Sequence, residues 1–228
     1  MSNEILLFDL DDTLYPSTTG LWTAIRERMV AYMQERMQLE PETIPTLRRY
    51  YYETYGTTLR GLQKHHQVNS DDYLEFVHDL PLHEYLEPAP ALRRLLDSLP
   101  QPKWVFTNAD EPHAGRVIDR LGLQGCFQGI IDVRALEFAV KPEERAYRRA
   151  VEIVGAEGAG QCILFDDSLN NLRAAVWVGF VTVLVGADRP HPDVTYTVPS
   201  LLELPRVMPQ LWNGTAPPGS GGEPRNGA

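Results

Sequence analysis

The sequence predicts an α/β fold in which a parallel β-sheet core carries an inserted, all-helical cap. Short apolar segments alternate with helical segments through the second half of the chain, which is typical of strands joined by crossover helices. A similar apolar segment, residues 5–8, stands near the N-terminus and ends in several aspartates. Between them, residues 17–86 have helical periodicity without the alternation of a strand. The early strand and the later ones are therefore expected to share one sheet, with the helical segment inserted over it.

The elements are expected in a regular order after the first strand. Leu21, Ile25 and Met29 begin a run of apolar side chains at three- and four-residue steps, which indicates an amphipathic helix. Beyond Pro88, helices are expected over residues 89–99, 113–121, 143–154 and 169–178, and strands over residues 104–106, 129–132, 162–165 and 181–185. The residues after Trp212 are rich in Gly, Pro, Ser and Asn and offer little apolar surface to pack. The predicted organisation is a core of residues 1–15 and 88–212, a helical cap of residues 16–87 and a disordered tail of residues 213–228.

The composition is that of an ordinary globular protein. Of the 228 residues, 43% are hydrophobic and 23% are charged, and the length suits one core with a smaller insertion. A net charge of −10 argues against a surface that binds nucleic-acid polymers or anionic membranes. The N-terminus has no basic segment followed by a long apolar run, so a cytoplasmic location is expected. Cys126 and Cys162 lack metal-ligand spacing and are expected to be buried thiols.

Acidic and polar residues follow the predicted strands, where an open parallel sheet places its chemistry. Asp9 and Asp11 are two residues apart in an extended segment, so their side chains point to the same side. Two carboxylates held together repel each other, and the pair therefore predicts a bound cation. Later along the chain come Thr107 and Asn108 after residues 104–106, Lys141 before a helical segment, and Asp166 and Asp167 after residues 162–165.

Each of these signals has a structural alternative. Thr107 could be a helix N-cap, Lys141 could be a surface lysine with Pro142 at the first helical position, and residues 166–168 could be a capping turn. The occurrence of all of them in this order argues against the alternatives taken together.

In order and spacing, these residues resemble the four motifs of the haloacid dehalogenase-like hydrolase superfamily, whose members are mostly phosphatases. Further segments are similar to its pyrimidine 5'-nucleotidase branch over residues 6–186; they are Tyr15-Pro16, Gly56-Thr57-Thr58-Leu59-Arg60-Gly61-Leu62, Phe106-Thr107-Asn108-Ala109-Asp110, His113-Ala114, Arg116-Val117, Leu121-Gly122-Leu123, Cys126-Phe127 and Phe165-Asp166-Asp167-Ser168 with Asn171. The resemblance implies a Rossmann-like core with a C1-type helical cap.

The resemblance also implies a role for each motif residue. Asp9 would be the nucleophile that forms an aspartyl-phosphate, and Asp11 would be the general acid and base, which requires a raised pKa. The phosphoryl oxygens would be bound by the Thr107 side chain, by the backbone amides of Leu10 and Asn108, and by Lys141.

A Mg²⁺ ion is the cofactor that this arrangement implies, because its preferred ligands are oxygen atoms. Its protein ligands would be Asp9, the backbone carbonyl of Asp11, and one or both of Asp166 and Asp167. The motif alignment makes Asp167 the direct ligand and Asp166 a water-mediated one, and the reverse assignment stays open.

The cap is expected to decide the substrate, because the core residues contact only the phosphate and its ester oxygen. Arg60 and Asp110 could contact a base or ribose, with a solvated face or a helix cap as the alternative. The tyrosines of residues 48–55 could stack on a nucleobase, although tyrosines at helical spacing more often pack. His65 and His66 are neighbours on a helix and diverge, so a shared metal site is not expected.

The sequence therefore predicts a Mg²⁺-dependent phosphomonoesterase, with the resemblance favouring UMP and CMP as substrates of a 5'-nucleotidase. The alternatives are a broad-specificity phosphatase for sugar phosphates or other nucleotides, a phosphomutase, and a non-catalytic ligand-binding protein. The resemblance disfavours a dehalogenase, because dehalogenases of this superfamily typically lack the carboxylates that stand here at Asp11, Asp166 and Asp167. The expected partner is a small phosphorylated substrate, without nucleic-acid polymer or membrane, and the protein is expected to be a monomer or a homodimer.

Overall fold

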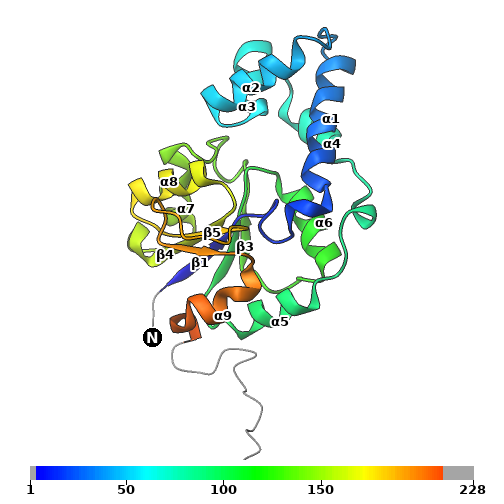
Figure 1. Cartoon of the computed structure of the whole chain (residues 1–228). Coiled ribbons are helices and arrows are strands. Elements are labelled where there is room, and N and C mark those ends of the chain that lie inside the picture. Colours follow the sequence, from blue (N-terminus) through cyan, green and yellow to red (C-terminus); the bar gives the residue numbers. More distant parts are fainter. Residues whose placement is uncertain (1–3, 213–228) are drawn as a thin grey trace, which may run out of the picture.

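A six-stranded parallel sheet forms the centre of the computed structural model, which describes residues 4–212 (Figure 1). The strands are β1 (Ile5–Phe8), β2 (Lys103–Phe106), β3 (Gly129–Ile131), β4 (Cys162–Asp166), β5 (Val181–Val185) and β6 (Tyr196–Val198). Their order is β3-β2-β1-β4-β5-β6, and every pairing is parallel. The predicted Rossmann-like sheet is confirmed. The predicted disordered tail, residues 213–228, lies outside the described residues.

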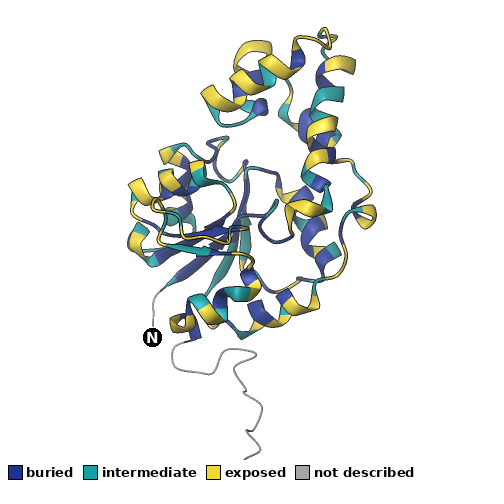
Figure 2. Cartoon of the chain, viewed as in Figure 1, coloured by how far each residue is buried: buried dark blue, intermediate teal, exposed yellow. Residues whose placement is uncertain are grey.

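The sheet is covered on both faces, which explains why its strands are continuous apolar runs. Leu6 and Phe8 pack on one face with α5 (Pro90–Ser98) and α6 (Glu111–Leu121). Leu7 points to the other face. The helices on that second face are α7 (Glu144–Ile153) and α8 (Leu169–Val178). Figure 2 shows the central strands as buried.

Short helices complete the core around this sheet. They are η3 (Ala159–Gln161), η4 (Leu201–Glu203), α9 (Leu204–Val207) and η5 (Pro209–Trp212). Leu204, Leu211 and Trp212 are buried against the same face as α5.

A group of helices lies over one edge of the sheet (Figure 1). These are α1 (Leu21–Glu35), α2 (Ile44–Tyr55), α3 (Thr58–His66) and α4 (Ser70–His78), with η1 (Ser17–Thr19) and η2 (Leu82–Glu84) at the two ends of the segment. They share an apolar cluster that includes Met33, Tyr51 and Leu62, together with Val133 and Val140 from the core. All elements between residues 17 and 84 are helical, as expected for a cap, and the exact cap boundaries stay predictions.

Some local expectations were wrong. The strand expected over 129–132 stops at Ile131, because the Asp132 carboxylate accepts backbone N–H groups from residues 111, 134 and 135. Pro142 is not the first residue of a helix: the Lys141–Pro142 peptide is cis, and α7 begins at Glu144. Strand β6 was not expected at all.

Cys126 and Cys162 are buried and free, as predicted. Within residues 4–212, no helix has the length and apolar character needed to cross a membrane.

Candidate active site

The carboxyl ends of three neighbouring strands bring the predicted site residues to one edge of the sheet. Asp9 follows β1, and its backbone N–H donates to the carbonyl of Phe165 in β4 at 2.8 Å. Thr107 follows β2, and its N–H donates to the carbonyl of Ile131 in β3 at 3.0 Å. A cavity of about 580 Å³ lies here, lined by core residues and by residues of α1 to α4. The parallel register therefore places residues distant in sequence around one space.

Most of the predicted site residues line this cavity. They are Asp9, Asp11, Thr107, Asn108, Lys141 and Asp167. Asp166 and the Leu10 side chain are fully buried and are not part of the lining.

Lys141 is the centre of the polar network, although its side chain is only 1% exposed. Its ammonium group donates to Asp9 Oδ1 at 2.7 Å, to Asp166 Oδ2 at 2.7 Å and to the Phe106 carbonyl at 2.8 Å. An ammonium has three donors, so all of them are used. Burial alone would lower the pKa of Lys141, but the charges of Asp166 and Asp9 outweigh burial and raise it. The surface alternative for Lys141 is therefore wrong.

The Asn108 side chain fixes the segment that carries Lys141. Asn108 Nδ2 donates to the Lys141 carbonyl at 2.9 Å, and Lys141 N–H donates to Asn108 Oδ1 at 2.8 Å. This reciprocal pair of hydrogen bonds fixes the backbone of Lys141, which follows β3 in the chain, to Asn108 at the end of β2. Only the backbone amide of Asn108 was expected to have a role, so its side chain is an additional positioning group.

Thr107 carries a hydroxyl that is fixed on one side. Its Oγ1 accepts the N–H of Ala109 at 3.0 Å, and the residue is 1% exposed while lining the cavity. Its own O–H is then available as a donor. The expected helix-cap alternative does not apply, because α6 begins after Asp110.

Asp166 is saturated by protein donors. Its Oδ1 accepts Ser168 N–H at 2.8 Å and Asn171 Nδ2 at 3.1 Å, while Oδ2 accepts Lys141 and the same Asn171 amide. Asp167 instead lines the cavity. Burial, followed by the charges of Asp166 and Asp12, raises its pKa to about 7. The capping alternative holds for Ser168 only, whose Oγ accepts from Asn171 N–H at the start of α8.

The three carboxylates of Asp9, Asp166 and Asp167 each have an oxygen within 4.8 Å of the others. The pKa of Asp9 is raised well above its usual value, because burial and the two neighbouring aspartates outweigh the stabilising charge of Lys141. The three carboxylates form a set of hard oxygen donors of the kind that suits a divalent cation.

Asp11 has a different environment from Asp9. Its Oδ1 accepts hydrogen bonds from Tyr15 Oη at 2.5 Å and from His113 Nε2 at 3.4 Å. Burial raises the pKa of Asp11, but these two donors together with the nearby His78 outweigh burial and lower it. The pKa of Asp11 is thus lowered, and not raised as would be expected for a general acid. The sequence did not reveal that Tyr15 and His113 donate to this carboxylate.

Asp12 is a further cavity residue, for which no role was predicted. It has a positive φ of 59°, and its buried Oδ1 has no hydrogen-bond partner among the described residues. Burial, then the charge of Asp11, raises its pKa to about 6, with Arg26 acting in the opposite direction.

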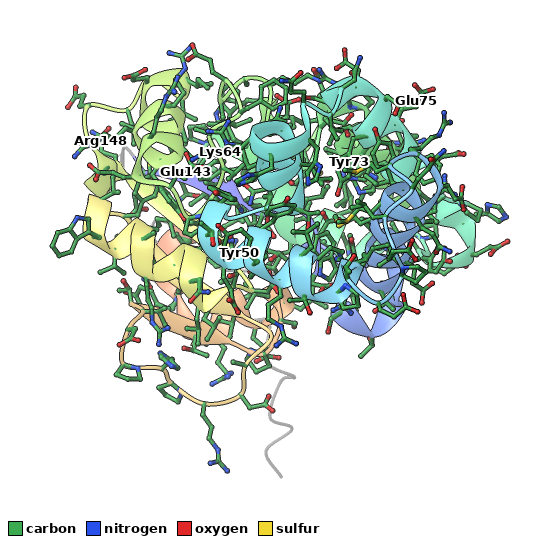
Figure 3. The ribbon with its side chains drawn as sticks, turned by 90° about the horizontal axis from the view of Figure 1, so that it is seen from above. Tyr50, Lys64, Tyr73, Glu75, Glu143 and Arg148 are labelled. Atoms are coloured by element: carbon green, nitrogen blue, oxygen red, sulfur yellow. The ribbon has the colours of Figure 1, made fainter. Side chains whose placement is uncertain are left out.

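Arg60 and Asp110 were the two residues expected to contact a base or ribose, and of these only Arg60 lines the cavity. It lines the cavity and pairs with Glu143 at 3.7 Å. Asp110 is buried and bound to His78 Nδ1 at 2.9 Å instead. Lys64 and Glu143 line a second cavity at the rim between cap and core (Figure 3).

The aromatic and histidine residues of the cap mainly serve packing. Tyr51 is buried in the cap cluster, and Tyr51 Oη and Tyr55 Oη make 2.8 Å hydrogen bonds to His66 and His65 respectively. The two histidines therefore have separate partners, in agreement with the expectation that they do not share a metal. Among the tyrosines of residues 48–55, Tyr52 is the one that lines the cavity at the strand ends.

The sequence as a whole matches a known family. A model of the haloacid dehalogenase-like hydrolases covers residues 4–179. This chain belongs to the haloacid dehalogenase-like hydrolase family. Phosphate metabolism protein 8 of Saccharomyces cerevisiae is 27% identical over 236 residues, which cover 91% of this chain and 73% of the yeast protein. The family prediction is confirmed, and the pyrimidine 5'-nucleotidase branch stays a prediction.

Solved structures with the same fold support this placement. CbbY from Rhodobacter sphaeroides, solved in complex with phosphate, aligns with a TM-score of 0.62 and 19% identity over 88% of this chain and 96% of CbbY. The HAD-hydrolase YfnB from Bacillus subtilis, solved with magnesium, aligns with a TM-score of 0.58 and 18% identity over 89% of this chain and 97% of YfnB. These similarities confirm the α/β fold.

Removal of the Lys141 charge tests the network. Lys141→Met should lower the free energy of unfolding by about 3 to 5 kcal/mol, because it leaves two buried carboxylates without their cation. Urea denaturation measures this change. The matched control is Lys64→Met in the exposed cap surface, which should change stability by less than about 0.5 kcal/mol. Equal stabilities for the two variants would contradict the central role of Lys141.

Proposed function

We propose that the protein is a Mg²⁺-dependent phosphomonoesterase that acts through an aspartyl-phosphate on Asp9 and hydrolyses pyrimidine nucleoside 5'-monophosphates such as UMP and CMP. The observation that carries this proposal is the arrangement of Asp9, which lines a large cavity while Lys141 holds one of its oxygens. Asp11 follows two residues later and lines the same cavity. A nucleophile and a proton-transfer group therefore face one substrate space.

The first half of the reaction transfers the phosphoryl group to the protein. The Lys141 ammonium binds Asp9 Oδ1. Within residues 4–212, Oδ2 accepts a single long hydrogen bond, from the Thr13 hydroxyl at 3.5 Å, and is therefore the oxygen free to attack phosphorus. A bond forms between this oxygen and phosphorus as the bond from phosphorus to the ester oxygen breaks. Binding of the anionic ester raises the pKa of Asp11, so that Asp11 takes up a proton from solvent and gives it to the departing oxygen, and the hydroxyl of Thr107 donates to a phosphoryl oxygen.

The second half of the reaction releases phosphate. Asp11, now ionised, accepts a proton from a water molecule as that water attacks phosphorus and the bond to Asp9 breaks. Inorganic phosphate leaves and the Asp9 carboxylate is restored. The donors that bind Asp11 Oδ1 favour the ionised form required for this step.

The donor set of the three aspartates fits Mg²⁺. Asp9 and Asp167 line the cavity and would bind the ion directly, whereas both oxygens of Asp166 are already held by Lys141, Ser168 and Asn171. Asp166 would then contact the ion through water, and the Asp11 carbonyl stays a proposed ligand. Bound there, Mg²⁺ would neutralise the repulsion between the carboxylates and an incoming phosphate.

The cap side of the cavity supports a substrate with a polar ring edge. Arg48 Nε, Gln63 Oε1 and Tyr73 Oη are buried and have no hydrogen-bond partner among the described residues, and all three residues line the cavity. Figure 3 shows Tyr73 on the cap. Leaving such groups unpaired is costly, so a ligand that supplies partners is favoured.

These groups combine donors and an acceptor, which suits a pyrimidine. The Arg48 guanidinium and the Tyr73 hydroxyl can donate to ring carbonyl oxygens, and Gln63 Oε1 can accept a ring N–H or amino group. Gln63 Nε2 donates to Ser70 Oγ at 2.6 Å, which leaves the amide oxygen as the unpaired atom. The name of the yeast relative, which refers to phosphate metabolism, and the phosphate complex of CbbY agree with a phosphorylated substrate.

Phosphate release across a substrate panel tests the activity. The wild-type protein with Mg²⁺ should hydrolyse UMP and CMP in preference to AMP, GMP and sugar phosphates, and Asp9→Asn should lower kcat on the order of 10³-fold or more. The control is Asp188→Asn at an exposed position, which should retain wild-type kcat. Undiminished hydrolysis by Asp9→Asn would exclude this nucleophile, and equal rates across the panel would remove the pyrimidine preference alone.

Metal binding has a readout independent of activity. Mg²⁺ at about 100 times its Kd should raise the free energy of unfolding by about 2.7 kcal/mol, because it binds only the folded protein. Asp167→Asn should reduce this stabilisation, whereas Asp188→Asn should not. Calorimetric melting with and without Mg²⁺ measures the effect. Full turnover in excess chelator, or equal stabilisation of both variants, would rule out the proposed site.

Replacement of Arg48 tests recognition by the cap. Arg48→Met should raise KM for UMP about 10-fold or more through loss of a charged hydrogen bond, and leave KM for p-nitrophenyl phosphate unchanged. Arg36→Met, at an exposed position of the same cap, is the matched control. Steady-state kinetics measure both constants. Parallel changes in KM for the two esters would show that Arg48 does not contact the nucleoside.

A further inference from the structure

Two stacked histidines join the cap to Asp11. His113, in the first turn of α6, is fully buried and places Nε2 3.4 Å from Asp11 Oδ1. His78 is the last residue of cap helix α4, and its ring lies on that of His113 with centroids 4.1 Å apart and an interplanar angle of 15°. His78 Nδ1 is 2.9 Å from Asp110 Oδ1. A continuous buried contact therefore runs from Asp110 through both rings to Asp11.

Asp11 receives both of its side-chain hydrogen bonds on one oxygen. A carboxylate only accepts hydrogen bonds, so Tyr15 Oη and His113 Nε2 are both donors to Oδ1. Among residues 4–212, no donor is bound to Oδ2 of Asp11. Two donors on a single oxygen restrict rotation of the carboxyl group and leave the other oxygen for exchange of a proton with the substrate.

The histidine pair is also fixed to the core independently of Asp11. Arg116 Nη2 donates to the His78 carbonyl at 2.7 Å, which holds the end of α4 against α6. Asp110 precedes α6 and orients the His78 ring through Nδ1. These two contacts hold the His78 ring on α6, where it stacks on His113, and so place the end of the cap helix against the residue that contacts Asp11.

We propose that His113 is a positioning residue for Asp11, and that His78 links its position to the cap. This inference rests on the proposed phosphomonoesterase function. As the bond from phosphorus to the ester oxygen breaks, the electron pair of that oxygen takes the proton held on Asp11 Oδ2, and the attacking water later returns a proton to Oδ2. The anchored Oδ1 holds Oδ2 on the cavity side for both transfers.

The leaving group separates a positioning role from a structural one. Nitrophenolate leaves without protonation, whereas the ribose 5'-oxygen of UMP needs a proton. His113→Leu should therefore lower the rate of ester cleavage in the first turnover about 10- to 100-fold for UMP and leave the first-turnover release of nitrophenolate from p-nitrophenyl phosphate within about 3-fold. His113→Gln, which retains an N–H donor, should restore part of the loss with UMP. His66→Leu removes the hydrogen bond to Tyr51 in the cap and is the matched control, with both rates unchanged.

Each outcome decides the inference. Tyr15→Phe removes the second donor to Oδ1 and should give the same selective loss, which keeps the test valid where His113→Leu does not fold. Equal losses of the first-turnover cleavage rate on the two esters in the folded variants would overturn the positioning role while leaving the phosphomonoesterase function in place. Absence of turnover of either ester by the wild-type protein would overturn the proposed function and this inference with it.

Discussion

The buried ammonium group of Lys141 is the interaction on which the active-site edge depends. Its three hydrogen bonds join the ends of β1, β2 and β4 through Asp9, the Phe106 carbonyl and Asp166. Without this cation the buried carboxylates would repel each other in a poorly solvating environment. The oxygens of Asp9, Asp166 and Asp167 lie within 4.8 Å of one another, an arrangement of hard donors that suits a divalent ion. The same three hydrogen bonds of Lys141 therefore offset the charges of Asp9 and Asp166 and hold the three strand ends together.

The core strands, and the meeting of the candidate site residues at the strand ends, could be predicted because they depend on local signals. Strands buried on both faces are continuous apolar runs, and Asp9, Thr107 and Asp166 stand directly at strand ends. The roles of side chains that meet across long sequence separations could not be predicted. Asn108 bonding to Lys141 and His78 stacking on His113 result from tertiary packing, which periodicity does not encode. Strand β6 was missed because its sequence, Tyr-Thr-Val, contains no pair of adjacent apolar residues like the two isoleucines of β3.

The cap supplies a local environment that opposes the overall charge of the protein. The net charge is −10, yet Arg26, Arg48, Arg49 and Arg60 all line the main cavity. An anionic substrate would therefore meet positive groups from the cap and Lys141 from the core. In the proposed reaction the core residues act on the phosphate ester alone, and the unpaired polar atoms of the cap would select the group attached to it. The His78–His113 contact would make these two parts act together.

The most direct test of the account is detection of phosphate on Asp9. The protein is mixed with UMP and Mg²⁺, quenched in acid during turnover and digested, and the peptides are examined by mass spectrometry. The account predicts one phosphoryl group on the peptide that contains Asp9, and its absence in Asp9→Asn. Turnover of UMP with no phosphoryl group on that peptide, or with the group on another residue, would contradict Asp9 as the nucleophile.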